Sequence, residues 1–92
     1  MYASNRGLDC IAVFALTADG GVDVSVPTIF APTGGQTPRG FCLSADGALL
    51  AVVHQHSRSL ALFDVDTTTG TLTSWGPATP LPHHAPVCVR FV

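Results

Sequence analysis

The sequence predicts an all-β fold made of repeated groups of antiparallel strands, and three observations predict it. First, one pattern occurs twice: Phe14 corresponds to Phe63, 49 residues later, and Pro38 corresponds to Pro86, 48 residues later. Second, short runs rich in Val, Ile, Leu, Phe and Thr alternate with clusters of Gly, Pro, Asp and Asn. Third, no useful length shows the period of about 3.6 residues that marks an amphipathic helix. A repeat of this length filled with short strands is typical of a β-propeller or another stacked array.

Eight strands are expected from these runs. Their ranges are 1–5, 10–17, 22–30, 39–44, 48–54, 59–65, 71–75 and 86–92. The Asp- and Gly-rich segments 18–21, 44–47 and 66–70 supply the positive backbone angles that tight hairpins need.

The strands sort into antiparallel β-propeller blades. Residues 39–75 supply four consecutive strands, which is one complete blade. Residues 1–30 supply three strands of an incomplete blade whose innermost strand is missing, and residues 86–92 supply the inner strand of the closing blade. We therefore expect about two blades' worth of strands, a C-terminal fragment of a propeller.

The composition agrees with a piece whose flanks are normally covered. Hydrophobic residues make up 47% of the 92 residues and charged residues only 11%, which is low for a free-standing domain. A core of this size is marginal by itself. We expect the remaining propeller blades, or self-association, to cover the open edges, and the isolated chain to be inactive and to aggregate or associate.

Several classes of partner are disfavoured. The net charge of -2 comes from six Asp and four Arg, without Lys or Glu, so no basic stripe exists to follow a nucleic acid. No apolar run reaches the roughly 18 residues that span a membrane. Cys10, Cys42 and Cys88 are widely spaced within apolar patterns and are expected to be reduced core residues of a cytoplasmic protein.

Alternate connections of an up-and-down meander lie at one end of the strands, and here that end collects polar residues. The connections concerned are 5–9, 31–39, 54–59 and 76–86. They carry Arg6, Arg39 and Arg58, all four His and both Gln. Three of the four cations on one rim favour an anionic ligand.

Motifs along the whole chain, taken in order, resemble the C-terminal end of the lactonase family of seven-bladed β-propellers. This family includes the bacterial propeller-type 6-phosphogluconolactonase and the fungal carboxymuconate-lactonizing enzyme. The resemblance extends over essentially the whole chain and rests on these segments: Tyr2-Ala3-Ser4-Asn5-Arg6, Ile11-Ala12-Val13-Phe14, Thr33 to Phe41, Asp46-Gly47, His54-Gln55, Asp66 to Leu72 and Pro86 to Val92.

The resemblance implies a hydrolase that opens 6-phospho-D-glucono-1,5-lactone to 6-phosphogluconate in the pentose phosphate pathway. It implies a cleft lined by a His, a Glu and Arg residues, and the Arg of the Tyr-x-Ser-x-Arg motif falls on Arg6. The family's His and Glu lie upstream, and this chain contains no Glu. A guanidinium suits the oxyanion of lactone hydrolysis, so Arg6 is the predicted catalytic residue.

Three further residues are predicted to bind the substrate, a phosphorylated sugar lactone. Arg39 follows Thr-Pro as a recurrent Arg does in the family, and Gln55 and Asn5 supply hydrogen bonds. Each arginine keeps an alternative: Arg6 as a surface residue that pairs with Asp9, and Arg39 as a tie between adjacent blades through backbone carbonyls.

Other features favour structural roles. The segment 33–36, Thr-Gly-Gly-Gln, could form a backbone nest for phosphate, but a plain connection between blades is favoured. His54, His56, His83 and His84 lack a neighbouring carboxylate, so neither a metal nor another cofactor is expected. Trp75 is expected to pack between blades. The competing function is a non-catalytic propeller repeat that serves as a binding or scaffolding module.

Overall fold

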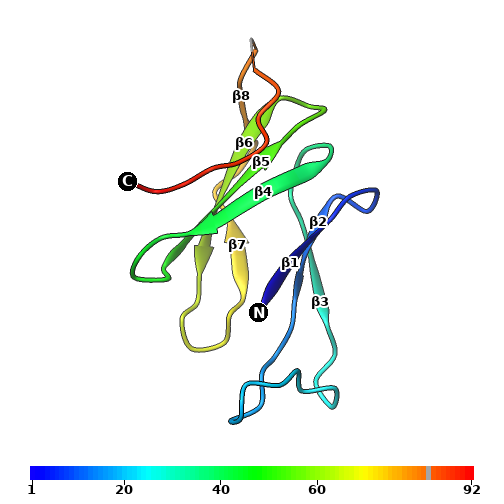
Figure 1. Ribbon diagram of the computed structural model, residues 1–92, viewed down its shortest axis with the longest axis vertical. Helices are drawn as coiled ribbons and strands as arrows, with labels where there is room; N and C mark the ends of the chain where they lie inside the picture. The colour runs from blue at the N-terminus through cyan, green and yellow to red at the C-terminus, as the bar shows by residue number, and fades with distance from the viewer. Residues whose placement is uncertain (83) are drawn as a thin grey trace.

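The computed structural model describes residues 1–82 and 84–92, which form two antiparallel sheets with no helix in the described part of the chain (Figure 1). The first sheet has the order β1-β2-β3, and the second has the order β4-β5-β6-β7 with β8 also paired to β6. The strands are β1 (Tyr2–Asn5), β2 (Cys10–Val13), β3 (Ile29–Pro32), β4 (Pro38–Leu43), β5 (Leu49–His54), β6 (Ser59–Val65), β7 (Leu72–Ser74) and β8 (Thr79–Pro80). The prediction of an all-β antiparallel fold is confirmed.

The repeat seen in the sequence is also a repeat of backbone geometry. Asn5 pairs with Cys10 at the end of the β1–β2 hairpin, and His54 pairs with Ser59 at the end of the β5–β6 hairpin. The residue before the second strand has a positive φ in both turns, 53° at Asp9 and 51° at Arg58. Residues 49 positions apart therefore occupy equivalent places in the two sheets.

The expected strand over 22–30 is wrong in its position, because β3 covers Ile29–Pro32 and residues 14–28 form a long loop. The Asp23 carboxylate accepts hydrogen bonds from the backbone N and the hydroxyl of Ser25, at 3.0 and 2.6 Å. Such local bonds compete with strand pairing, and Pro27 lacks an N–H for a ladder. Only an isolated bridge, Leu16 to Val22, closes the start of this loop.

Residues 86–92 are not in a strand, contrary to the expectation, and β8 forms earlier, beside β6. A strand needs a hydrogen-bonded neighbour, and no described residue supplies one to this segment. The segment instead crosses β4, where a Cβ on Gly40 would lie 2.8 Å from the carbonyl O of Val87 and 2.9 Å from the Cα of Cys88. Its role as an inner strand of a closing blade stays a prediction.

The buried core lies between the two sheets. It consists of Ile11, Leu50, Val52, Ala61 and Phe63. Because Ile11 comes from β2 and the other four come from the second sheet, the two sheets share one core.

Two expectations about core residues are wrong for this chain. Trp75 is 58% exposed, and its indole N–H donates to the Asp64 carboxylate at 2.9 Å. The three cysteines are free thiols, but only Cys10 is buried, whereas Cys42 is half-buried and Cys88 is exposed. Trp75 follows the edge strand β7, Cys42 lies in the opposite edge strand β4, and Cys88 lies in the segment after the last strand.

A single phenol ties the first sheet to the second. The Tyr2 hydroxyl donates a hydrogen bond of 2.7 Å to the carbonyl O of Gly70, in the β6–β7 turn. Burial raises the pKa of Tyr2. This contact closes the side of the interface that lies away from the β3–β4 connection.

Replacing Tyr2 by Phe removes this hydrogen bond and leaves the Gly70 carbonyl without its partner. We expect the free energy of unfolding to fall by about 1 kcal/mol. Thermal unfolding followed by circular dichroism, at one protein concentration, measures the change. Trp75→Phe is the matched control, because it removes an aromatic donor at an exposed site and should change stability by less; equal losses would contradict the role of Tyr2.

Candidate functional site

Three connections meet at one end of the strands, and the β3–β4 connection lies between the other two. On one side, the backbone N and the hydroxyl of Thr33 donate to the carbonyl O of Asp9 at 3.1 and 2.9 Å. The backbone N of Thr37 donates to the Asp9 carboxylate at 3.0 Å. Asp9 thus holds both ends of the connecting loop against the β1–β2 turn.

The other side of the same loop contacts the β5–β6 turn. The backbone N of Gln55 donates to the carbonyl O of Thr37 at 2.9 Å, and the backbone N of Gln36 donates to the Ser57 hydroxyl at 2.8 Å. The Thr37 hydroxyl also forms a hydrogen bond with Nδ1 of His56. We call residues 33–37 the bridging loop, because they link the turns of the two sheets.

The contacts of the bridging loop bear on the two alternatives for Thr33 to Gln36, a backbone nest for phosphate and a plain connection. The backbone N–H groups of Thr33, Gln36 and Thr37 all donate to protein acceptors. These three amides are therefore not available to a phosphate. The loop connects the two sheets.

His54 lies beneath the bridging loop and is fully buried, with 0% of its surface exposed. Its Nδ1 lies 3.3 Å from the carbonyl O and 3.1 Å from the hydroxyl of Ser59. Its Nε2 is buried without a hydrogen-bond partner among the described residues. Burial lowers the pKa of His54 and outweighs the Ser59 hydrogen bond and the Asp9 charge, which act in the opposite direction.

Arg39 and Gln55 are brought together at this end of the molecule. Arg39 is the second residue of β4, Gln55 is the first residue after β5, and the Arg39 Nη1 donates to the Gln55 Oε1 at 2.9 Å. Arg39 is exposed, and Gln55 is half-buried. The bond aligns a guanidinium on the rim without neutralising its charge, because its acceptor is an uncharged amide.

Arg6 and Asn5 lie on the equivalent turn of the first sheet. Asn5 ends β1, and Arg6, which follows it, is exposed. By the repeat, Arg6 corresponds to Gln55 and Asn5 to His54. No hydrogen bond among the described residues joins Arg6 or Asn5 to the pair formed by Arg39 and Gln55.

Asp9 is the partner that the sequence suggests as an alternative for Arg6, but the Asp9 carboxylate accepts its hydrogen bonds from other residues. The Asp9 carboxylate accepts from the backbone N of Gly7 at 3.3 Å and from that of Thr37. The sequence analysis missed this structural use of Asp9. The repeat held a signal for it, because Asp9 aligns with Arg58, and these two are among the three non-glycine residues with a positive φ, the third being Thr37.

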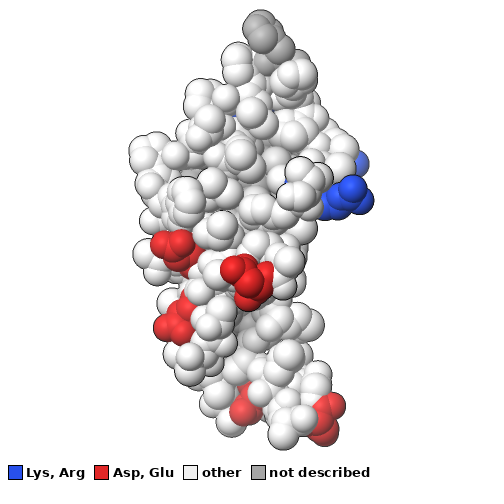
Figure 2. All heavy atoms as spheres, turned by 90° about the vertical axis from the view of Figure 1, so that its left-hand side faces the viewer, with Lys and Arg blue, Asp and Glu red and all other residues white. Residues whose placement is uncertain are grey.

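The charges are separated along the molecule. In the face drawn in Figure 2, the blue Arg surface lies above the red Asp surface. Asp19, Asp46 and Asp66 lie in the turns at the end opposite the bridging loop, and hydrogen bonds from nearby hydroxyls and amides lower the pKa of each carboxyl. The end that carries Arg6, Arg39 and Arg58 is therefore more favourable for an anion than the end that carries these aspartates.

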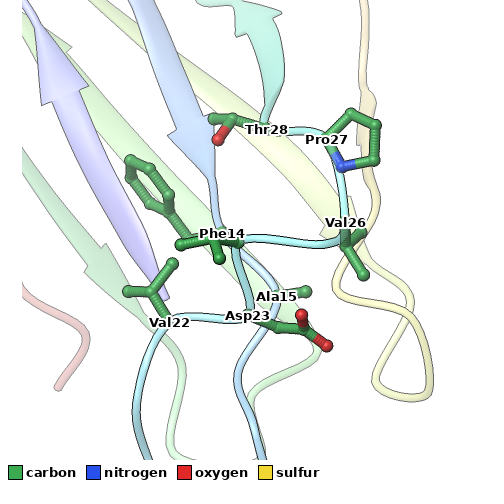
Figure 3. Close-up of a pocket in the computed structure, with 8 residues that line it drawn as sticks. Phe14, Ala15, Val22, Asp23, Val26, Pro27 and Thr28 are labelled. Atoms are coloured by element: carbon green, nitrogen blue, oxygen red, sulfur yellow. The ribbon is translucent and has the colours of Figure 1, made fainter.

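A hollow of about 270 Å³ lies in the loop between β2 and β3 (Figure 3). It is lined by Phe14, Ala15, Val22, Asp23, Val24, Val26, Pro27 and Thr28. This lining holds no cation and no nucleophile beyond a threonine hydroxyl, and it lies at the end of β2 opposite the turn that carries Arg6. The hollow is therefore not the candidate site.

The described residues contain no group of three or more His, Cys, Asp or Glu that could hold a metal ion. Of the histidines weighed as ligands, His83 lies outside the described residues. No helix in the described chain is long and apolar enough to cross a membrane.

Comparison with known proteins shows the family. The model of the family described as Lactonase, 7-bladed beta-propeller, matches residues 1–91, so the chain belongs to this family. The resemblance inferred from the sequence is thereby confirmed.

Individual relatives agree with this assignment. A Bacillus subtilis protein named 6-phosphogluconolactonase is 34% identical over 92 residues, which are 100% of this chain and 25% of the relative. A Lactobacillus plantarum structure has a TM-score of 0.81 at 37% identity, covering 99% of this chain and 25% of that one. A Bacteroides uniformis structure, provisionally named 6-phosphogluconolactonase, has a TM-score of 0.83 at 31% identity with the same coverage. The chain thus spans about a quarter of the length of these relatives.

Replacing Gly35 by Ala tests the packing of the bridging loop on His54. The added Cβ would lie 2.5 Å from Cγ of the fully buried imidazole, so the loop or the ring would have to shift. We expect a loss of about 1–3 kcal/mol in the free energy of unfolding. In the control, Gly21→Ala, the added Cβ would meet the Thr17 hydroxyl at 3.4 Å; chemical unfolding that gives equal losses for the two variants would contradict the close packing.

Acidification should destabilise the fold through His54. Its folded-state pKa is lowered from 6.5, so the unfolded chain binds more protons in the window below pH 6.5. The free energy of unfolding should therefore fall as the pH drops through 6.5. His54→Asn, which introduces the residue found at the equivalent position 5, should flatten this part of a pH series of unfolding curves, and an unchanged slope would argue against burial of a neutral imidazole.

Proposed function

We propose that this chain supplies part of the active face of a cytoplasmic lactonase that hydrolyses 6-phospho-D-glucono-1,5-lactone to 6-phosphogluconate in the pentose phosphate pathway. The match of the lactonase family over residues 1–91 carries the proposal. It is supported by the relative named 6-phosphogluconolactonase, which aligns with the whole chain. The arginines at the bridging-loop end suit a substrate that bears a phosphate.

In this proposal Arg6 is the catalytic residue of the chain. Water gives one proton to a general base as it adds to the lactone carbonyl carbon, and the carbonyl oxygen becomes an oxyanion in a tetrahedral intermediate. The bond from that carbon to the ring oxygen then breaks, the ring oxygen takes the proton back from the base, and the new carboxylic acid loses its proton to solvent to give the carboxylate of the open-chain product. A guanidinium keeps its charge throughout and offers paired donors to the oxyanion as it forms.

Arg39, Gln55 and Asn5 bind the substrate. A guanidinium has five N–H donors, and Gln55 accepts from one of the Arg39 nitrogens, so further donors remain for phosphate oxygens. The Gln55 amide and the Asn5 side chain, at the ends of equivalent strands, can bind sugar hydroxyls. The contact between Arg39 and Gln55 limits the rotation of the cation before a ligand arrives.

The chain is not sufficient for turnover in this proposal. It spans about a quarter of its relatives and contains no Glu, so the general base comes from elsewhere in a complete propeller. The other blades also complete the cleft around Arg6 and Arg39.

A chimera tests the proposal and the role of Arg6. The 92 residues replace the aligned segment of the Bacillus subtilis protein, and hydrolysis of 6-phosphogluconolactone is measured. We expect turnover, and a loss in kcat/KM on the order of 10²-fold for Arg6→Ala, as for removal of one oxyanion donor. Arg6→Lys should recover only part, because an ammonium lacks the paired donors.

Arg58→Asn is the matched control, because it removes a cation from a neighbouring turn while Asn tolerates the positive φ of that position. It should change kcat/KM by less than Arg6→Ala. Wild-type kinetics for Arg6→Ala would remove Arg6 from the active site. A folded chimera without any turnover would instead favour the alternative, a propeller repeat that binds or scaffolds.

A further inference from the structure

Thr37 has a backbone conformation that its own side chain and its neighbour disfavour. Its φ is 61°, in the left-handed region, whereas a β-branched side chain and a following proline both favour an extended backbone. The other non-glycine residues with a positive φ among those described, Asp9 and Arg58, are not β-branched and precede no proline. A conformation of this kind persists only where the surrounding structure holds it, and such positions gather at functional sites.

Three separate contacts hold Thr37 in this conformation. Its backbone N donates to the Asp9 carboxylate at 3.0 Å, and its carbonyl O accepts from the backbone N of Gln55 at 2.9 Å. Its hydroxyl forms a hydrogen bond with Nδ1 of His56. The first contact comes from the β1–β2 turn and the other two come from the β5–β6 turn. Both sheets therefore fix the direction in which the chain enters β4.

Arg39, two residues further on, is the extra residue of a bulge at the start of β4. The residues on either side of it pair with consecutive residues of β5, so Arg39 has no partner of its own in the ladder. A bulge changes the direction in which a side chain points, and bulges are common next to active sites. Here the guanidinium Nη1 donates to the Gln55 Oε1 at 2.9 Å.

Gln55 connects the strained residue to the bulge. Thr37 binds its backbone N, Arg39 binds its side chain, and one proline lies between Thr37 and Arg39 in the sequence. Because the proline ring fixes its own φ at about −65°, a rotation at Thr37 is passed on to Arg39. If Thr37 returned to an extended backbone, its carbonyl would turn away from Gln55 and the start of β4 would move with it.

We propose that Thr37 is a positioning residue for the substrate phosphate: its left-handed backbone sets the bulge at Arg39 and so holds the guanidinium beside Gln55. This inference rests on the proposed lactonase function and adds a residue that does not touch the substrate. The contacts of Thr37 exist in the free protein, so Arg39 is in place before the substrate arrives and less ordering is needed on binding.

A double-mutant cycle in the Bacillus subtilis chimera tests this role. Thr37→Val keeps the shape of the side chain, removes the hydroxyl that binds His56, and retains β-branching, which favours an extended backbone. We expect KM for 6-phosphogluconolactone to rise on the order of 10-fold, the scale of one hydrogen bond to a charged group, with kcat nearly unchanged. In an Arg39→Ala background the same substitution should raise KM no further, because the positioned group is already absent.

Thr33→Val is the matched control, because it removes a hydroxyl from the same loop that donates to the carbonyl O of Asp9, at a residue without a positive φ. It should lower stability yet leave KM close to that of the parent chimera. Thr37→Asn should raise KM less than Thr37→Val, since Asn tolerates the left-handed region. An equal rise in KM for Thr33→Val, or the same effect of Thr37→Val with and without Arg39, would overturn the proposal.

Nuclear magnetic resonance of the same chimeras gives a readout that does not depend on turnover. Thr37→Val keeps the carbonyl that binds Gln55, so faster hydrogen exchange of the Gln55 backbone amide would report that this carbonyl has turned away. We expect this faster exchange, together with weaker nuclear Overhauser contacts between the side chains of Arg39 and Gln55. Unchanged exchange and contacts would overturn the proposal.

The two readouts separate this inference from the function on which it rests. A folded parent chimera without turnover would count against the lactonase function, and the resonance comparison would still decide whether Thr37 positions Arg39. If Thr37→Val does not fold, Thr37→Gly replaces it. Glycine adopts the left-handed region without strain but also many other conformations, so the same coupling to Arg39 is expected.

Discussion

The arrangement of the two sheets depends on one close contact, between the bridging loop and the imidazole of His54. Gly35 lies so near the buried ring that no Cβ fits between them. On either side of Gly35, Thr33 and Thr37 both reach Asp9 on the first sheet, while Thr37 meets the β5–β6 turn of the second. A larger residue at position 35 would therefore disturb all of these hydrogen bonds at once.

The same contact positions the candidate site. The bridging loop leads directly into β4, so its conformation determines where Arg39 begins that strand. Gln55 is held from two directions, through its backbone N by Thr37 and through its side chain by Arg39. The chemistry proposed for the rim is therefore coupled to the packing beneath it, where a neutral His54 is favoured by burial.

Much of this fold could be predicted from the sequence, because alternating apolar residues and Asp/Gly turns act locally. The predicted four-stranded group over 39–75 corresponds to β4 to β7. The Val-rich run over 22–30 led to a wrong strand prediction. The Asp23 carboxylate binds the backbone N of Ser25, and Pro27 has no N–H, so these amides do not pair with a neighbouring strand. The contacts of the bridging loop with Asp9 and His54 could not be predicted from local patterns. Asp9 and Thr37, for example, are 28 residues apart and meet only when both sheets have formed.

Native-state hydrogen exchange tests most directly whether the bridging loop joins the sheets. The amides of Thr33, Thr37 and Gln55 lie outside strand ladders, yet each donates to a buried or half-buried acceptor. They should exchange as slowly as the amides within the pair of β5 and β6, since the same opening must expose them. Exchange of these three amides at the rate of the exposed turn 66–70, while the β5–β6 amides stay protected, would contradict the account.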